Sequence, residues 1–244
     1  MLELARASWT DVRDHLASHR GIAVLPVGAL EQHGPHLPLS TDTLQADAVA
    51  RRLAERLDAV LLPALPLGNT WSNDQLPGTV SVSADTVYAF ASDVAASLER
   101  AGYELLVLVN GDFGNRNPLQ RAAEDAAARG GIPVVVLDYP GLIEIGDEVK
   151  ESPWAAPGLC HADELETSMI LAVAPDLVHA DRMAPSYPEL PADFGLRQMA
   201  LAPLSETGVF GDPRPATAEK GERIIEHVVA QSEAVMRRVI EALG

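Results

Sequence analysis

The chain has 244 residues, of which 47% are hydrophobic and 22% charged, with 18 Lys and Arg against 35 Asp and Glu. This length and composition are typical of one globular domain spanning 1–244, and they exclude a disordered chain. The net charge of −17 excludes nucleic acids and anionic membranes as principal partners, because the mean field of the protein repels their phosphates.

The N-terminal segment 1–20 carries charges throughout and lacks the apolar run of a signal peptide. No later segment is apolar over the length that a membrane span needs. Cys160 is the only cysteine, so no intramolecular disulfide can form, which fits a reducing compartment. We therefore expect a cytoplasmic protein, and we interpret Cys160 as a small buried residue.

Strand and helix patterns alternate along the first part of the chain. Apolar runs predict buried strands at 21–29, 59–68, 103–112 and 132–140. Helical periodicity predicts helices at 8–19, 42–59, 83–102 and 117–131. Either Thr41 or Asp42 is expected to cap the second helix. Such alternation with short connections predicts an α/β sheet with helices packed on both faces.

The last third of the chain is less regular. The segment ETSMILAVA at 166–174 has a helical pattern, and a final helix is expected at about 217–243. Stretches rich in proline and glycine at 184–195 and 209–222 predict ordered loops and not a separate domain.

Three polar clusters follow predicted elements, and ligands gather at the carboxyl ends of strands in open α/β sheets. The first cluster, EQHGPHLPLSTD, places Glu31 and His33 two residues apart, so an extended backbone points both side chains the same way. Asp42 falls at the start of a helix, where the dipole favours a carboxylate that can also face a metal ion. Carboxylates with imidazole suit Zn²⁺, Mn²⁺ or Fe²⁺. The alternative is that Asp42 only caps the helix and that His33 and His36 are polar loop residues.

The second cluster, VNGDFGN, follows a buried strand, and its glycines allow a ligand to approach the backbone closely. The residues Asn-Gly-Asp of this cluster are also common in turns that have no function. The third cluster, CHADELETS, contains one histidine and three carboxylates: His161, Asp163, Glu164 and Glu166. Acidic residues are expected at a helix N-terminus without any function, but His161 has no such explanation. Together the clusters predict one site of several carboxylates and two histidines.

These motifs resemble the creatininase (creatinine amidohydrolase) family, which also contains mycofactocin-associated peptidases and formamide hydrolases. The resemblance rests on EQHGPHLPLSTD, LPGTVS, VNGDFGN, HADELETSMILAVAPDLV and GVFGDPRPATAEKG, and it runs from about residue 20 to the last helix. It implies a three-layer α/β/α fold with a mostly parallel sheet. It also implies two divalent metal ions (Zn, Mn or Fe) that activate a water against an amide carbon.

The resemblance assigns roles to residues at matching positions. It implies that the metal ligands are Glu31, His33, Asp42, Asp112 and Glu166, with Asp42 bridging the two ions. His161 matches the catalytic histidine of the family, and either His161 or Glu164 is expected to carry a proton to the leaving nitrogen. Contacts to substrate are expected from Trp71, Asp74, Asn110, Phe113, Asn115 and Trp154. His36 is expected to be structural.

The sequence departs from the family pattern in three places. Asp112 stands where the family usually has the histidine of NGHGGN, and this added negative charge favours harder metals such as Mn²⁺ or Mg²⁺. The segment WSND at 71–74 replaces a Glu-His pair that many relatives carry before LPGT. Asp163 stands where glycine is usual, and we expect it to crowd or reshape the entrance to the site.

We therefore expect a metal-dependent amidohydrolase that acts on an amide, lactam or formamide of a small molecule or peptide other than creatinine. Two alternatives stay open. One is the same scaffold redirected to amide formation, ring closure or another non-hydrolytic step, and the other is a non-catalytic binding protein. The resemblance also implies a homo-oligomer, often a hexamer. The apolar segment 184–204 is either its contact surface or a cover over the site.

Overall fold

The computed structural model describes residues 1–244 and contains one five-stranded sheet. Its strands are β1 (Leu2–Glu3), β2 (Ile22–Val27), β3 (Val60–Leu61), β4 (Leu105–Asn110) and β5 (Val134–Leu137). They lie in the order β1-β3-β2-β4-β5, and all neighbouring strands are parallel. β2 pairs with β4 from Ile22 opposite Leu105 to Val27 opposite Asn110. The carboxyl ends of β2 and β4 therefore lie beside each other.

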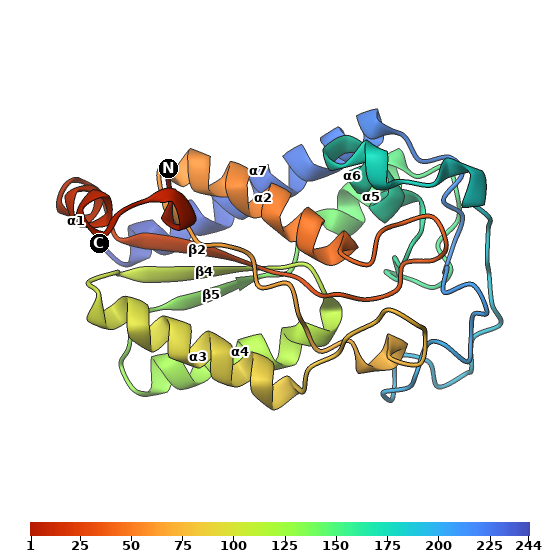
Figure 1. The fold of residues 1–244 in the computed structure, drawn as a ribbon, viewed down its shortest axis with the longest axis horizontal. Coiled ribbons are helices and arrows are strands. Elements are labelled where there is room, and N and C mark those ends of the chain that lie inside the picture. Colours follow the sequence, from red (N-terminus) through yellow and green to blue (C-terminus); the bar gives the residue numbers. More distant parts are fainter.

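Helices cover both faces of the sheet (Figure 1). The α-helices of the structure are α1 (Trp9–Ser18), α2 (Thr41–Leu57), α3 (Ala84–Arg100), α4 (Arg116–Ala128), α5 (Leu142–Val149), α6 (Glu164–Val173) and α7 (Ala218–Ala242). α2 and α7 lie on one face, and α3 and α4 lie on the other. The predicted three-layer fold with a parallel sheet is confirmed. None of the helices combines the length and the apolar character that crossing a membrane requires.

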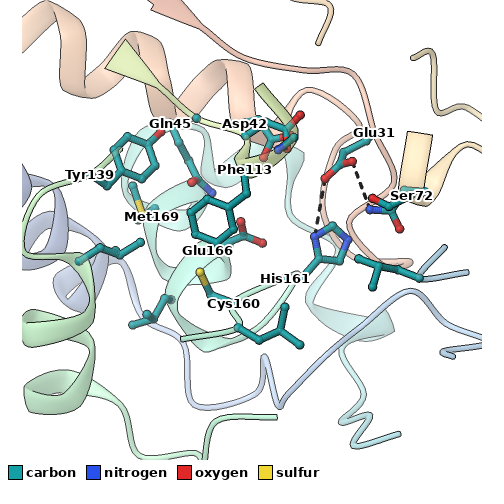
Figure 2. A pocket seen from close by; sticks show the side chains of 18 residues that line it. Glu31, Asp42, Gln45, Ser72, Phe113, Tyr139, Cys160, His161, Glu166 and Met169 are labelled. Atoms are coloured by element: carbon teal, nitrogen blue, oxygen red, sulfur yellow. Dashed lines mark hydrogen bonds and ion pairs between the residues drawn. The ribbon is translucent and has the colours of Figure 1, made fainter. Parts of the chain in front are cut away.

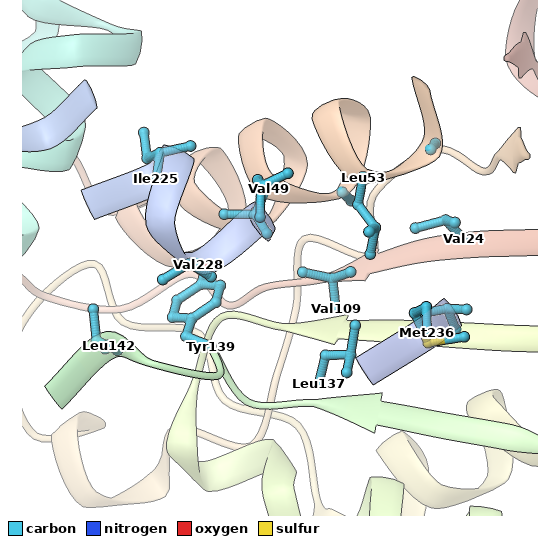
Figure 3. Close-up of a cluster of buried hydrophobic side chains, with 14 of the residues drawn as sticks. Val24, Val49, Leu53, Val109, Leu137, Tyr139, Leu142, Ile225, Val228 and Met236 are labelled. Atoms are coloured by element: carbon cyan, nitrogen blue, oxygen red, sulfur yellow. The ribbon is translucent and has the colours of Figure 1, made fainter. Parts of the chain in front are cut away.

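The alternation of side chains along β4 divides the core into two clusters. Val109 packs with Val49 of α2 and Val228 of α7, as Figure 3 shows. Leu106 and Leu108 point the other way, into the cluster formed with α3 and α4. Because both faces of β4 are covered, its sequence is a continuous apolar run, as is typical of a central parallel strand.

The structure differs from the sequence-based prediction at three elements. The strand predicted at 59–68 is only Val60–Leu61, with a single bridge from Leu65 to Val27. Pro63 and Pro66 explain this, because proline lacks the N–H that a strand ladder needs. The two-residue β1 and the eight-residue α5 were not predicted, since neither is long enough for a clear periodic signal.

Candidate metal centre

Six polar side chains meet in one buried cluster beyond the carboxyl ends of β2 and β4. They form three overlapping groups, and the ligand atoms within each group lie within 4.8 Å of one another. The groups are His33 with Asp42 and Glu166, Glu31 with Asp42 and Asp112, and Glu31 with His33 and His161. The structure therefore brings together all five predicted metal ligands and the predicted catalytic histidine. Asp42 is the residue common to the two groups that do not contain His161.

The loop 28–40 turns Glu31 and His33 back over the end of the sheet. The N–H of Glu31 donates to the carbonyl of Leu39 at 2.9 Å, which closes the loop. His33 Nδ1 lies 3.2 Å from the carbonyl oxygen of Glu31, which leaves Nε2 facing Asp42 Oδ1 at 3.1 Å. The N-cap residue of α2 lies two positions before Asp42, so the interpretation of Asp42 as the helix cap is wrong.

The loop after β4 supplies Asp112. Its Oδ1 accepts from the N–H of Gly114 at 2.9 Å, while Oδ2 is buried without a hydrogen-bond partner. Gly114 has to be glycine, because a Cβ there would lie 2.0 Å from the carbonyl oxygen of Asn69. Asn115 accepts from the N–H of Asn69 at 2.8 Å and donates to the carbonyl of Gly28 at 3.1 Å. Asn115 thus ties this loop to the loop that follows β2.

The first turn of α6 supplies Glu166. Its Oε2 accepts from the N–H of Ala162 at 2.6 Å and lies 3.5 Å from His33 Nε2. Asp163 caps the helix by accepting from two N–H groups of this turn, at 2.9 and 3.4 Å, and it also pairs with Lys150. Asp163 does not line the cavity, so the expectation that it crowds the entrance is wrong. Instead, it stabilises the helix start that positions Glu166.

Glu164 is held away from the cluster. Its carboxylate accepts from the N–H groups of Glu151, at 3.0 and 3.1 Å, and Ser152, at 2.8 Å, and pairs with Lys220 Nζ at 2.6 Å. It does not line the cavity. These contacts account for its pKa, which lies below the usual range because the hydrogen bonds from Lys220 and Ser152 outweigh the opposing effect of burial. The structure thus gives Glu164 a role in holding the loop before α6.

Two further residues of the motifs also lie outside the cavity. His36 Nε2 lies 2.9 Å from Thr167 Oγ1, so this ring anchors the loop after β2 against α6. Asn110 donates to Asp138 Oδ1 at 2.6 Å, which joins the ends of β4 and β5. Both side chains support the loops that carry the cluster.

The electrostatics of the cluster fit divalent cations. Burial, together with Asp42 and Asp112, raises the pKa of Glu31 well above its usual range. Burial and Asp42 likewise raise the pKa of Asp112 to about 8. Although burial opposes it, Asp42 and Glu166 raise the pKa of His33 well above its ordinary value. Without cations the cluster therefore retains protons, because its four carboxylates cannot all ionise at such close range.

The donor atoms support the same conclusion. Asp42 Oδ2 and Asp112 Oδ2 are both buried and without a hydrogen-bond partner. Buried polar atoms are normally satisfied, so each of these calls for a partner. Imidazole nitrogen and carboxylate oxygen are ligands for Zn²⁺ and Mn²⁺. The residues present therefore fit bound divalent metal.

A cavity of about 110 Å³ opens onto the cluster (Figure 2). Its apolar wall consists of Phe113, Leu142, Leu159, Cys160, Leu165, Met169 and Leu201. Its polar wall includes Gln45, Ser72, Asn73 and Tyr139 in addition to the cluster itself. Gln45 Nε2 and the Tyr139 hydroxyl are buried without partners, on the side of the cavity opposite Glu31 (Figure 2).

Of the aromatic and polar residues expected to contact substrate, only Phe113 lines this cavity. Trp71 is 39% exposed and Asp74 is also exposed, while their neighbours Ser72 and Asn73 face the cavity. Trp154 stacks its ring on Lys150, with Nζ 4.7 Å from the ring centroid, and donates to Asp147 at 2.8 Å.

The sequence reasoning missed Gln45, Tyr139, Ser72 and Asn73. Gln45 follows Asp42 by three positions on α2, so helical spacing alone places both on one face. Tyr139 follows the end of β5, where site residues of open α/β sheets are found. These two signals could have identified Gln45 and Tyr139.

The chain is thus a parallel α/β protein with a candidate metal centre of carboxylates and imidazole at its strand ends. It belongs to the creatininase family of metal-dependent amidohydrolases, because the model of that family, described as creatinine amidohydrolase, matches residues 5–236. The resemblance seen in the motifs is therefore confirmed.

Relatives and solved structures support this assignment. The creatinine amidohydrolase of Pseudomonas putida is 30% identical over 90% of each chain. The mycofactocin precursor peptide peptidase of Mycolicibacterium smegmatis is 33% identical, over 90% of this chain and 86% of the relative. A manganese creatininase structure has a TM-score of 0.85 and 28% identity, covering 97% of this chain and 98% of its own. A zinc-zinc form of a creatininase mutant has a TM-score of 0.84 and 28% identity, covering 97% of both chains.

Proposed function

We propose that this protein is a dinuclear metal-dependent amidohydrolase that cleaves the C–N bond of an amide, lactam or formamide in a small molecule or peptide. The observation that carries the proposal is the position of Asp42, which is the one residue common to the two ligand groups that do not contain His161. One ion would be held by His33, Asp42 and Glu166, and the other by Glu31, Asp42 and Asp112. Two ions also match the charge of the cluster, because four ionised carboxylates carry −4 and two divalent cations carry +4.

The metals and the surrounding side chains have separate tasks. When bound, two divalent cations lower the pKa of a water and polarise an amide carbonyl, so no Ser or Cys nucleophile is required. His161 lines the cavity, and its ring centroid lies 4.5 Å from that of His33. Burial and the neighbouring His33 lower the pKa of His161 to about 3, so its ring is neutral at physiological pH. Of the two residues expected to be catalytic, Glu164 is held outside the cavity, so His161 is the one that can contact the substrate amide.

The cavity indicates the kind of substrate. Its size and apolar wall fit a small apolar group next to the scissile amide. The unpartnered Gln45 and Tyr139 side chains could donate to a hydrogen-bond acceptor elsewhere on the substrate. The relatives are named for different reactions, including a 3-dehydro-scyllo-inosose hydrolase of Thermotoga maritima that is 25% identical over 90% of this chain and 78% of its own. We therefore propose a class of substrate and not a relative's compound.

Metal analysis tests the proposal directly. Protein purified without chelator is expected to contain about two equivalents of divalent metal by elemental analysis, and added Mn²⁺ or Zn²⁺ should activate release of amine from a panel of formamides, lactams and short peptides. Asp42→Asn should remove both metals, while Asp74→Asn is the matched control because Asp74 is exposed and outside the cavity. Less than about half an equivalent of metal, with no activation, would count against the proposal.

A homo-oligomer, with a hexamer as one form, remains a prediction, as does a cytoplasmic location. Within the segment 184–204, Leu201 lines the cavity, so this part covers the site. Leu196 of the same segment is 85% exposed, which leaves an apolar surface available for another copy. Analytical ultracentrifugation of the protein and of Leu196→Glu tests this, because a change from oligomer to monomer is expected only if the segment forms the contact.

A further inference from the structure

Gln32 lies between Glu31 and His33 in the chain, yet its side chain belongs to none of the three ligand groups. The residue is buried, and its amide contacts four polar groups. Gln32 Oε1 accepts from the N–H of Gly34 at 3.0 Å. Gln32 Nε2 lies 3.0 Å from Asn73 Oδ1, 3.3 Å from the carbonyl oxygen of Gly208 and 2.7 Å from His161 Nε2.

The orientation of this amide is fixed by two backbone groups. Gly34 presents an N–H, which can only donate, and Gly208 presents a carbonyl, which can only accept. With the amide turned over, its NH₂ would face the N–H of Gly34 and its oxygen would face the carbonyl of Gly208. Gly208 also fits closely, since a Cβ there would lie 1.8 Å from Gln32 Oε1. The NH₂ group of Gln32 is therefore the group that faces His161.

Asn73 extends this set of hydrogen bonds in the same donor-to-acceptor direction. Its Oδ1 accepts from Gln32, and its Nδ2 donates to Glu31 Oε2 at 3.2 Å. Turning this amide over would place its NH₂ against that of Gln32 and its oxygen against the Glu31 carboxylate. The chain of hydrogen bonds from Gly34 through Gln32 therefore has one consistent direction.

The hydrogen position on His161 follows from this direction. The Gln32 NH₂ group cannot accept a hydrogen bond and lies 2.7 Å from His161 Nε2, so a hydrogen on that nitrogen would face another donor; Nε2 therefore holds a lone pair, and the neutral imidazole carries its hydrogen on Nδ1. Nδ1 faces the cluster, 3.7 Å from Glu31 Oε1 (Figure 2).

We propose that Gln32 is a positioning residue that holds His161 as the Nδ1–H tautomer, so that His161 presents a hydrogen-bond donor to the cavity and does not ligate metal. The meaning for catalysis rests on the proposed amidohydrolase function. A neutral imidazole N–H can polarise a substrate carbonyl, but it has no lone pair on that side to accept a proton from water. Of the three ligand groups, the one that contains His161 is then not a metal site.

Nitrogen NMR tests the tautomer without a substrate. The protein is labelled with ¹⁵N-histidine, loaded with Zn²⁺ or treated with chelator, and His161→Asn identifies the signals of His161. We expect hydrogen on Nδ1 in both preparations. Gln32→Glu is nearly isosteric and replaces the donor with an acceptor, so it should move the hydrogen to Nε2. Gln120→Leu, a change of an exposed glutamine on α4, should leave the tautomer unchanged.

A kinetic readout separates positioning from a structural effect. With the best amide of the panel, Gln32→Leu should lower kcat by about 10- to 100-fold, with KM and metal content nearly unchanged. The reason is that the His161 N–H stabilises mainly the transition state, so its misplacement affects kcat more than KM. An Nε2–H tautomer in the wild-type protein, or an imidazolium at pH 7, would overturn the inference even if the protein binds two metals and hydrolyses amides. If the protein binds no metal but shows Nδ1–H, the proposed function fails and the tautomer assignment stands.

Discussion

Lys150 and Asp163 form an ion pair from which water is almost completely excluded, since their side chains are 3% and 1% exposed. Asp163 also caps α6, whose first turn carries Glu166. Removing one partner of a buried pair leaves an uncompensated charge, which typically costs more than the pair contributes. The pair therefore makes the start of α6, and with it one ligand of the proposed metal site, sensitive to substitution.

We expect Lys150→Met and Asp163→Asn each to lower the free energy of unfolding by about 3–5 kcal/mol. The double variant should lose less than the sum, because it leaves no unpaired charge buried. Urea denaturation of chelator-treated protein measures all three. Arg237→Met is the control, since Arg237 is 66% exposed in its pair with Glu233 and should cost less than about 1 kcal/mol. Single variants no less stable than this control would contradict the prediction.

Metal binding should be coupled to proton release. The pKa of Asp112 is raised to about 8 in the metal-free protein, so this carboxyl is protonated at pH 7 and must lose its proton to bind an ion. Metal affinity should rise between pH 6 and pH 8 by about tenfold per pH unit for each proton released. Competition titrations with Zn²⁺, together with an indicator dye in weak buffer, measure both quantities. An affinity independent of pH would refute the coupling.

The raised pKa of Asp112 should also make the stability of the metal-free protein depend on pH. Asp112 binds its proton more tightly in the folded state, where its pKa is about 8, than in the unfolded state, where it is about 4. Folded protein therefore holds more protons on Asp112 between these values, and the contribution of Asp112 to the free energy of unfolding should fall as the pH rises from 4 to 8, while the lowered pKa values of His36 and His161 act in the opposite direction below about pH 6.5. The raised pKa of His33 acts in the same direction as that of Asp112. Saturating Zn²⁺ should remove much of this fall, which thermal unfolding with and without metal can measure.

Much of the site was accessible from sequence because its motifs follow β2 and β4, which pair along their full length. Parallel pairing brings their carboxyl ends together, so Glu31 and Asp112 meet although they are far apart in the chain. Trp154 was chosen by residue type, but its position depends on packing against Lys150, which no local pattern reveals. Tyr139 follows the end of β5, but that its hydroxyl lacks a partner is a property of the folded core.

Asp112→Asn should reduce the metal content from two equivalents to one. The new side chain can keep the hydrogen bond from Gly114, so the loop should hold its shape. It loses the charged oxygen of one ligand group while His33, Asp42 and Glu166 remain. The ion of the group that contains Asp112 should lose more than the roughly 10- to 100-fold in affinity that is typical when a residue hydrogen-bonded to a ligand is lost. Loss of both ions together, or of neither, would contradict the assignment of the two groups.

Asp112→His decides between hydrolysis and a redirected reaction. Imidazole is also a good ligand for Zn²⁺ and Mn²⁺, so under the proposed function this variant should keep two ions and retain measurable hydrolysis of the wild-type substrate. Elemental analysis and amine release measure these outcomes. If hydrolysis instead increases while a different native reaction, such as ring closure, is lost, the scaffold has been redirected. Asp74→Asn again controls for changes of surface charge.

Tyr139→Phe should separate substrate recognition from folding. The Tyr139 hydroxyl is buried without a partner, so removing it should raise the free energy of unfolding of the substrate-free protein by about 1 kcal/mol. The same change should raise KM by roughly tenfold for an amide that carries a hydrogen-bond acceptor, and hardly at all for its methylene analogue. Tyr88→Phe is the matched control, because its hydroxyl donates to Asp125 at 2.6 Å outside the cavity. That control should lose stability slightly and keep KM unchanged. If Tyr139→Phe behaves like the control, the hydroxyl has no role in recognition.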